Sequence, residues 1–181
     1  QAVIGKPLMD DEDRLICPAQ ADGSGVDVIV TTISCGPVVK TMLVGLLADV
    51  SLRSVENLAL SINTQVVDRI KLDDSRRVEE QVDDFLNKKP DVVLIAGGLN
   101  GGSTQFIQKI LETIGIAIYL LHTSERPMIL FSGNNQIAED VRSIFGNLVS
   151  QVQISPNIRP SLDVEDLLPA QRQLANMVID L

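Results

Sequence analysis

A glycine-rich loop is the segment of this sequence whose residues are best placed to bind a ligand. It spans residues 97–104 (Gly-Gly-Leu-Asn-Gly-Gly-Ser-Thr) and follows an apolar, β-branched run at residues 91–96. That run predicts a strand buried on both faces, and apolar residues at helical spacing from Phe106 to Ile114 predict a helix after the loop. Glycines allow another molecule to approach the backbone closely. The free N–H groups at the start of the helix then form a potential anion site.

The loop does not match the common nucleotide-binding patterns. It lacks the Gly-Lys-Ser/Thr end of a P-loop and the Gly-x-Gly-x-x-Gly spacing of a dinucleotide fingerprint. A tight turn that needs glycine and binds nothing is therefore an equally open interpretation, because folds reuse such turns without reusing a function.

Two other loops share the small, polar character of the glycine-rich loop. Residues 34–36 follow a predicted strand at 26–33, and residues 132–135 follow one at 128–131. Loops that follow parallel strands gather at one edge of the sheet, where ligands usually bind. The predicted ligand-binding residues are Ser34, Gly98, Asn100, Gly101, Gly102, Ser103, Ser132, Gly133 and Asn134. The alternative is that such turns favour Gly, Ser and Asn for backbone reasons alone.

The composition of the three loops indicates what they would bind. They offer backbone N–H groups and helix N-termini and contain no acidic side chain, which favours a small anion or a phosphate. They contain no Lys or Arg either, so the expected dissociation constant is weak, at about 1 mM. A protein surface that uses the same amides is the other candidate.

Other reactive residues do not form a recognisable centre. Cys35 is predicted at a helix N-terminus, but nothing places the single histidine, His122, beside it as a base. One His and two separated Cys do not make a zinc site, and the acidic run at residues 10–13 is typical of a solvated turn. We therefore predict no catalytic residue, no metal and no cofactor.

Composition narrows the classes of partner. The 181 residues carry a net charge of −9, and aromatic residues make up only 3%. Nucleic acid and anionic membranes are thus unexpected partners, and no apolar run is long enough to span a bilayer. The pair Cys17 and Cys35 fits a reduced, cytoplasmic setting. Because the chain starts at Gln1, we expect a piece of a longer protein.

The order of the predicted elements indicates an α/β fold. Strands are predicted at residues 26–33, 64–72, 91–96, 128–131 and 149–154, with helices at 37–50, 51–62, 78–88, 105–122 and 137–145 and at the end of the chain. Alternation of this kind predicts a three-layer, Rossmann-like domain, with a mostly parallel sheet of about five strands and helices on both faces. Residues 1–25 would be an N-terminal extension or edge strand and 26–181 the domain. The predicted core includes Phe85, Leu94, Ile110, Ile129 and Val141.

Several short motifs resemble those of the glutamate mutase accessory protein family, whose members are called MutL-like. Residues 96–102 resemble its Ala-Gly-Gly-Thr-Asp-Gly-Gly, with Leu99 and Asn100 in place of Thr and Asp. Residues 131–134 (Phe-Ser-Gly-Asn) are similar to its Tyr-Ala-Gly-Asn, residues 157–160 (Asn-Ile-Arg-Pro) to its Asn-Val-Met-Pro, and residues 44–46 to its Val-Gly-Leu. The motifs agree in order and spacing over roughly residues 26–181.

The resemblance implies a place in the actin, sugar-kinase and heat-shock ATPase superfamily. Two phosphate motifs of that family, Asp-x-Gly-Ser-Thr and Asp-Ile-Gly-Gly-Ala-Thr-Thr, are absent from this sequence, which looks like the segment between them. It implies a non-catalytic recognition domain of an accessory ATPase-like protein, which contacts a protein partner or other domains of the full-length chain and does not hydrolyse ATP alone. The alternatives are a small-molecule or phosphate-binding domain and a dimerisation module.

Overall fold

The computed structural model describes residues 5–11, 14–30 and 36–179. Contacts group the chain into two compact units, residues 1–35 and residues 36–181. The described part of the first unit consists of turns and bends, with one isolated antiparallel bridge between Met9 and Leu15. The division of the chain after residue 25 stays a prediction. All elements discussed below belong to the second unit.

A parallel sheet forms the centre of the second unit. Its strands, among the described residues, are β1 (Val39–Val44), β2 (Thr64–Ile70), β3 (Val92–Ile95), β4 (Met128–Phe131) and β5 (Val152–Ile154). They lie in the order β2-β1-β3-β4-β5, and every neighbouring pair is parallel. The sheet therefore grows from β1 in both directions, as in doubly wound α/β folds.

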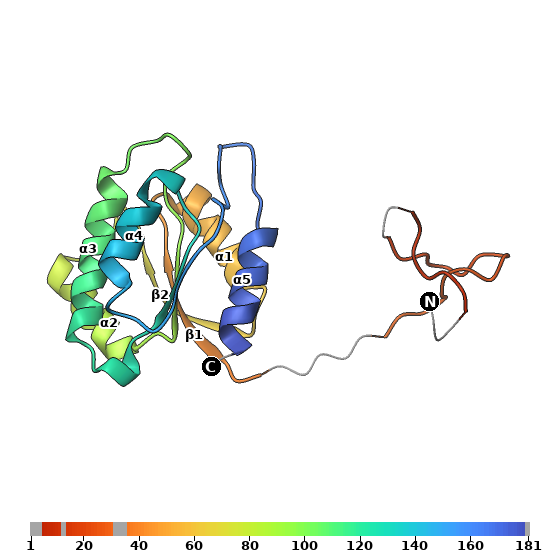
Figure 1. The fold of residues 1–181 in the computed structure, drawn as a ribbon, viewed down its shortest axis with the longest axis horizontal. Helices are drawn as coiled ribbons and strands as arrows, with labels where there is room; N and C mark the ends of the chain where they lie inside the picture. The colour runs from red at the N-terminus through yellow and green to blue at the C-terminus, as the bar shows by residue number, and fades with distance from the viewer. Residues whose placement is uncertain (1–4, 12–13, 31–35, 180–181) are drawn as a thin grey trace. The chain divides into compact units, whose positions relative to one another are not determined.

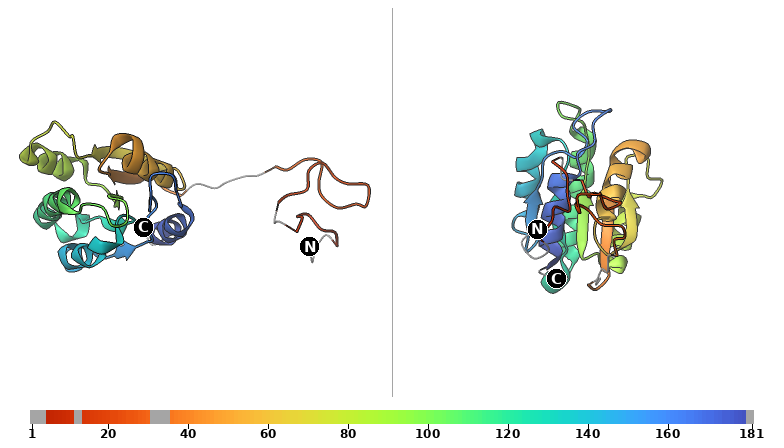
Figure 2. Two further views of the ribbon diagram at one scale, coloured as in Figure 1. Left: turned by 90° about the horizontal axis from the view of Figure 1, so that it is seen from above. Right: turned by 90° about the vertical axis from the view of Figure 1, so that its right-hand side faces the viewer.

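Helices cover both faces of this sheet (Figures 1 and 2). They are α1 (Arg53–Ala59), α2 (Val78–Lys88), α3 (Gln105–Leu120), α4 (Ala138–Phe145) and α5 (Leu168–Ile179), with short helical turns at Ala48–Leu52, Thr123–Glu125 and Asn135–Ile137. Helices α2, α3 and α4 lie on one face, and α1 and α5 lie on the other. The predicted three-layer α/β architecture with a parallel sheet is confirmed.

Each face of the sheet has its own apolar core. Phe85, Ile129 and Val141 are buried in the core under α2, α3 and α4, and Ile110 packs half-buried against it. Leu94 is buried in the core under α1 and α5. The predicted core residues are thus confirmed, and they divide between two cores because helices cover both faces of the sheet.

The prediction for the first strand was wrong. Residues 26–30 form no strand, and β1 instead occupies residues within the predicted helix 37–50. In β1, Met42, Leu43 and Val44 are all fully buried. A central strand covered on both faces has a continuous apolar sequence, and periodicity alone cannot distinguish such a run from a buried helix. The described β-branched residues before it, such as Val28 and Val30, are strongly exposed.

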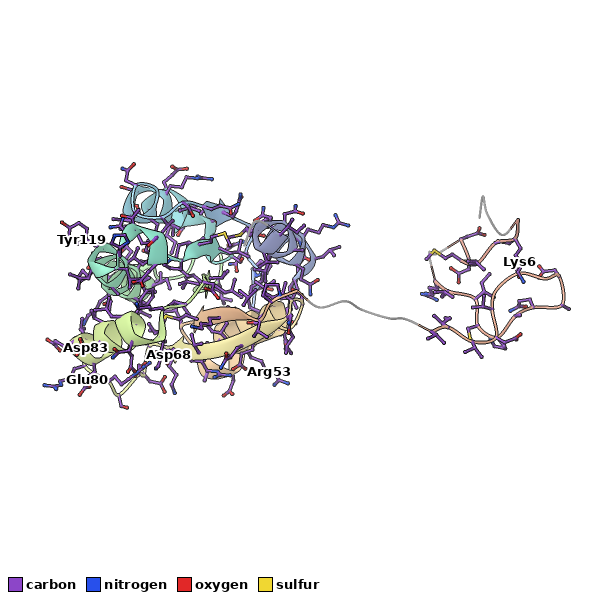
Figure 3. The ribbon with its side chains drawn as sticks, turned by 90° about the horizontal axis from the view of Figure 1, so that it is seen from below. Lys6, Arg53, Asp68, Glu80, Asp83 and Tyr119 are labelled. Carbon is purple, nitrogen blue, oxygen red and sulfur yellow. The ribbon has the colours of Figure 1, made fainter. Side chains whose placement is uncertain are left out.

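A cluster of charges connects β2 to α2. Figure 3 labels Asp68 of β2 and the carboxylates Glu80 and Asp83 of α2. The guanidinium of Arg76 contacts Asp68 at 2.8 Å, Asp74 at 2.6 Å and Asp84 at 2.5 Å. Hydrogen bonds from Arg76 lower the pKa of Asp74 and of Asp84. The side chains of Asp68 and Asp74 are only 11% and 9% exposed, and Lys88 is a second cationic partner of Asp68 at 3.2 Å and of Asp84 at 3.1 Å.

The variant Arg76→Gln should lower the free energy of unfolding at neutral pH by roughly 1–3 kcal/mol, because it removes the ionic donor of the part-buried Asp74 and leaves Asp68 paired with Lys88 alone. A carboxylate with a lowered folded-state pKa stabilises the fold above its unfolded pKa, and that stability is lost as the pH falls through the folded value. The difference between wild type and variant should therefore shrink below about pH 4.

Urea unfolding of the whole chain across this pH range measures both effects. Arg77→Gln is the matched control, since Arg77 is next in the chain, has a side chain 76% exposed and pairs with Glu80 at 3.2 Å. It should change stability by less than about 0.5 kcal/mol. A difference for Arg76→Gln that stays constant down to pH 3 would contradict the assignment.

Candidate functional site

A pocket of about 290 Å³ opens at the carboxyl edge of the sheet, between the loop that follows β1 and the loop that follows β3. Its lining comes from four separate stretches of the chain: Leu46, Leu47, Val50 and Ser51; Leu72; Ala96, Gly97, Gly98, Leu99, Gly102, Ser103 and Phe106; and Asn157, Arg159 and Leu162. Most of these side chains are apolar. One carries a charge, that of Arg159.

The position of the pocket follows from the strand order. The chain leaves β1 toward β2 on one side of the sheet, and β3 lies on the other side of β1. Helix α1, after β1, packs on one face, and α3, after β3, packs on the opposite face. The two loops therefore separate above the sheet and leave a crevice, which is where ligands bind in open α/β sheets.

The wall after β1 is held by a serine and a glycine. The hydroxyl of Ser51 accepts hydrogen bonds from the backbone N–H groups of Leu46 at 2.8 Å and Leu47 at 3.0 Å. A Cβ added to Gly45 would lie 2.6 Å from the backbone nitrogen of Leu52. The loop and the helical turn after it thus pack directly against each other, which requires glycine at this position.

The wall after β3 is fixed by close backbone contact with the loop after β4. A Cβ on Gly133 would lie 2.7 Å from the nitrogen of Gly97 and 2.8 Å from its carbonyl oxygen. Next to it, the N–H of Asn134 donates to the carbonyl of Gly97 at 3.0 Å, and the Asn134 side chain donates to the carbonyl of Gly102 at 3.2 Å. Asn134 is fully buried, so it supports the glycine-rich loop from behind.

A third segment, after β5, reaches across to the glycine-rich loop. The side-chain amide of Asn157 donates to the carbonyl of Gly98 at 3.1 Å and to Asn100 Oδ1 at 3.0 Å. Asn157 Oδ1 in turn accepts from the backbone N–H of Arg159 at 2.9 Å, and the N–H of Asn100 donates to the carbonyl of Pro160 at 3.2 Å. These bonds place Arg159 at the pocket.

The structure brings most of the predicted site residues together, though in different roles. Gly98, Gly102 and Ser103 line the pocket. Asn100 and Asn134 brace its wall, as described above. Gly101 takes a positive φ of 77° in the turn, while Ser132 and Gly133 are buried beneath the loop. Whether any of them binds a ligand stays a prediction.

Ser34 lies outside the described residues, and the reason for including it does not hold. The strand predicted before it is absent over residues 26–30, and β1 begins after it, at Val39. The carbonyl of Gly36 accepts a hydrogen bond at 2.9 Å from Asn63, the residue just before β2, so Gly36 lies at the amino edge of the sheet. The loop that follows the first strand is residues 45–47.

Sequence reasoning missed the residues that give the pocket its chemistry. Leu46, Leu47 and Val50 were assigned to a helix, and Arg159 lay outside the three loops considered. The motif at residues 157–160 was the available signal, since it contains both Asn157 and Arg159. The three loops themselves contain no Lys or Arg, as the sequence shows, and the basic residue in the pocket lining comes from the segment after β5.

Arg159 also borders a second, polar hollow on the α1 side, lined by Asp49, Val50, Arg53, Ser54, Asn57, Arg159 and Glu165. Within the described ranges, no three His, Cys, Asp or Glu side chains are grouped so that they could hold a metal ion. Nor is any helix in this part of the chain long and apolar enough to cross a membrane.

These features define a doubly wound α/β domain with an apolar pocket at its topological switch point. A family model described as MutL protein matches residues 9–180. Protein MutL of Clostridium tetanomorphum is 22% identical over 138 residues, which cover 75% of this chain and 27% of that protein. The chain therefore belongs to the MutL protein family, and the resemblance to the glutamate mutase accessory proteins is confirmed. The chain spans about a quarter of the length of this relative.

Proposed function

We propose that residues 36–181 form a non-catalytic recognition domain of an accessory protein, and that recognition takes place in the pocket between the loops after β1 and β3. The observation that carries the proposal is the pocket itself: it lies at the switch point of the sheet, and leucine, valine and phenylalanine side chains dominate its lining. Pockets of this composition and position bind small molecules or single side chains of a partner.

The construction of the pocket supports a binding role over a chance hollow. Its walls are held by part-buried hydrogen bonds, which the Ser51 hydroxyl accepts and the side-chain amides of Asn134 and Asn157 donate, so the concave surface exists before a ligand arrives. A preformed surface saves the ordering cost that weakens binding. Of the alternatives raised by the sequence, small-molecule binding fits the pocket, and a dimerisation module stays a prediction.

The probe for this proposal is isocaproamide, a neutral molecule with a branched aliphatic body. The pocket volume of about 290 Å³ corresponds to roughly ten water-sized groups at about 30 Å³ each, and isocaproamide fits within that. Titration into isotope-labelled full chain should shift the backbone amides of Gly98, Gly102 and Ser103 in a saturable manner. A ligand of this size should bind with a dissociation constant on the order of 1 mM.

Two variants on α3 make a matched pair for this titration. Phe106 lines the pocket and Ile116 does not, and both are 53% exposed. Phe106→Ala should weaken binding several-fold, and Ile116→Ala should leave it unchanged. Saturable shifts confined to residues away from the pocket, or equal losses in both variants, would refute the proposed function.

A further inference from the structure

Arg159 carries a guanidinium whose hydrogen-bonding capacity is not used up by the described residues around it. Its Nε is buried and has no hydrogen-bond partner among them. A buried N–H without a partner costs stability, so such groups in native proteins call for an explanation. The side chain as a whole is 23% exposed, which leaves part of the guanidinium reachable from outside.

The nearest carboxylate does not satisfy this group. Glu165 Oε1 lies 3.9 Å from Arg159 Nη1, which is too long for a hydrogen bond. The same Glu165 oxygen accepts a hydrogen bond at 2.6 Å from the hydroxyl of Ser54, which holds it on the α1 side. The contact between Arg159 and Glu165 is thus a loose ion pair, and a carboxylate entering the pocket would not need to displace a bidentate partner.

Arg159 is the one charged residue among the described residues of the pocket lining, so it matches a ligand with a single negative charge. The adjoining polar hollow contains two acidic side chains, Asp49 and Glu165, and two basic ones, Arg53 and Arg159. It therefore adds no net positive charge that would favour a dianion such as a phosphate ester. A carboxylate suits one planar guanidinium, since the two groups can form parallel hydrogen bonds. The leucines, Val50 and Phe106 on the other walls fit an aliphatic body.

From this arrangement we propose that the pocket binds a small organic monoanion, a carboxylate attached to a branched aliphatic body, with Arg159 as the residue that recognises the charge. This inference rests on the proposed function, because it assigns the ligand class of the same pocket. Helix α3 begins shortly after the pocket residue Ser103. The positive end of its dipole therefore lies near the pocket and favours a bound anion.

The test compares isocaproate with isocaproamide, which have the same shape and differ in charge. Wild-type chain should bind the carboxylate about 10-fold more tightly than the amide, as measured by titration of backbone amide shifts. Arg159→Met, which keeps the aliphatic stem, should reduce this preference to less than about 2-fold while the amide still binds. Arg53→Met is the matched control, because Arg53 borders the polar hollow but not the apolar pocket. It should keep the preference.

The outcomes separate this inference from the proposed function. Equal binding of carboxylate and amide by wild type would overturn the inference and leave the recognition pocket standing, and this comparison needs no variant to fold. A preference that survives Arg159→Met would also overturn it. Failure of both molecules to bind would overturn the proposed function itself.

Discussion

Truncation of Phe85 to alanine should lower the free energy of unfolding of the chain by about 3–5 kcal/mol. Phe85 lies on α2 with its side chain 1% exposed, inside the core that α2, α3 and α4 share with the sheet. The loss combines the transfer of the ring to water with the cavity left behind. Helix α2 ends at Lys88, one turn after Phe85, so little structure on its C-terminal side can collapse into the space.

Phe106→Ala is the control, since it removes the same atoms from a side chain that is 53% exposed on α3. It should cost less than about 1 kcal/mol. Both variants can be compared with wild type by urea unfolding followed by circular dichroism. A loss for Phe85→Ala below about 1 kcal/mol would mean that the packing of α2 on the sheet is wrong.

Gly133→Ala should destabilise the domain by about 3 kcal/mol, which is large for the addition of one methyl group. The new Cβ would approach the backbone nitrogen and oxygen of Gly97 to 2.7 and 2.8 Å and Phe131 Cζ to 2.8 Å. Backbone atoms cannot move aside as a flexible side chain can, so the loops after β3 and β4 must separate. That separation would also strain the hydrogen bond from Asn134 to Gly97.

Gly36→Ala is the matched control for this variant. A Cβ on Gly36 meets no described atom within 4 Å, so the substitution should change stability by less than about 0.5 kcal/mol. Thermal unfolding of both variants gives the comparison. If Gly133→Ala proved as stable as Gly36→Ala, the close contact between the two loops would not exist in solution. Loss of isocaproamide binding in Gly133→Ala would further connect this contact to the pocket.

Periodicity in the sequence was enough to predict the layers of the fold, because α2 has one apolar side, α3 has apolar residues at helical spacing, and β3 and β4 are short buried runs. It failed at β1, where Met42, Leu43 and Val44 are buried on both faces. A strand in that position has no alternation to distinguish it from a buried helix. Strand order was also beyond prediction, since it depends on which strands pair across the whole sheet.

The candidate site could be predicted only in part, for a related reason. The glycine-rich loop was recognisable because its residues are adjacent in the sequence. Arg159 was not, because its position depends on hydrogen bonds that Asn157 makes to Gly98 and Asn100, more than fifty residues earlier. Such long-range contacts leave no periodic signal. The motif at residues 157–160 marked the segment as notable without indicating where it lies.

The pocket is assembled from four stretches that are far apart in the sequence, at residues 46–51, 72, 96–106 and 157–162. No single stretch contains enough of the lining to form a binding surface, so binding requires that the sheet from β1 to β5 is already paired. Occupancy and folding are therefore thermodynamically linked. A ligand present at a hundred times its dissociation constant would add about 2.7 kcal/mol to the stability of the entire domain, including regions such as α2 that it never contacts.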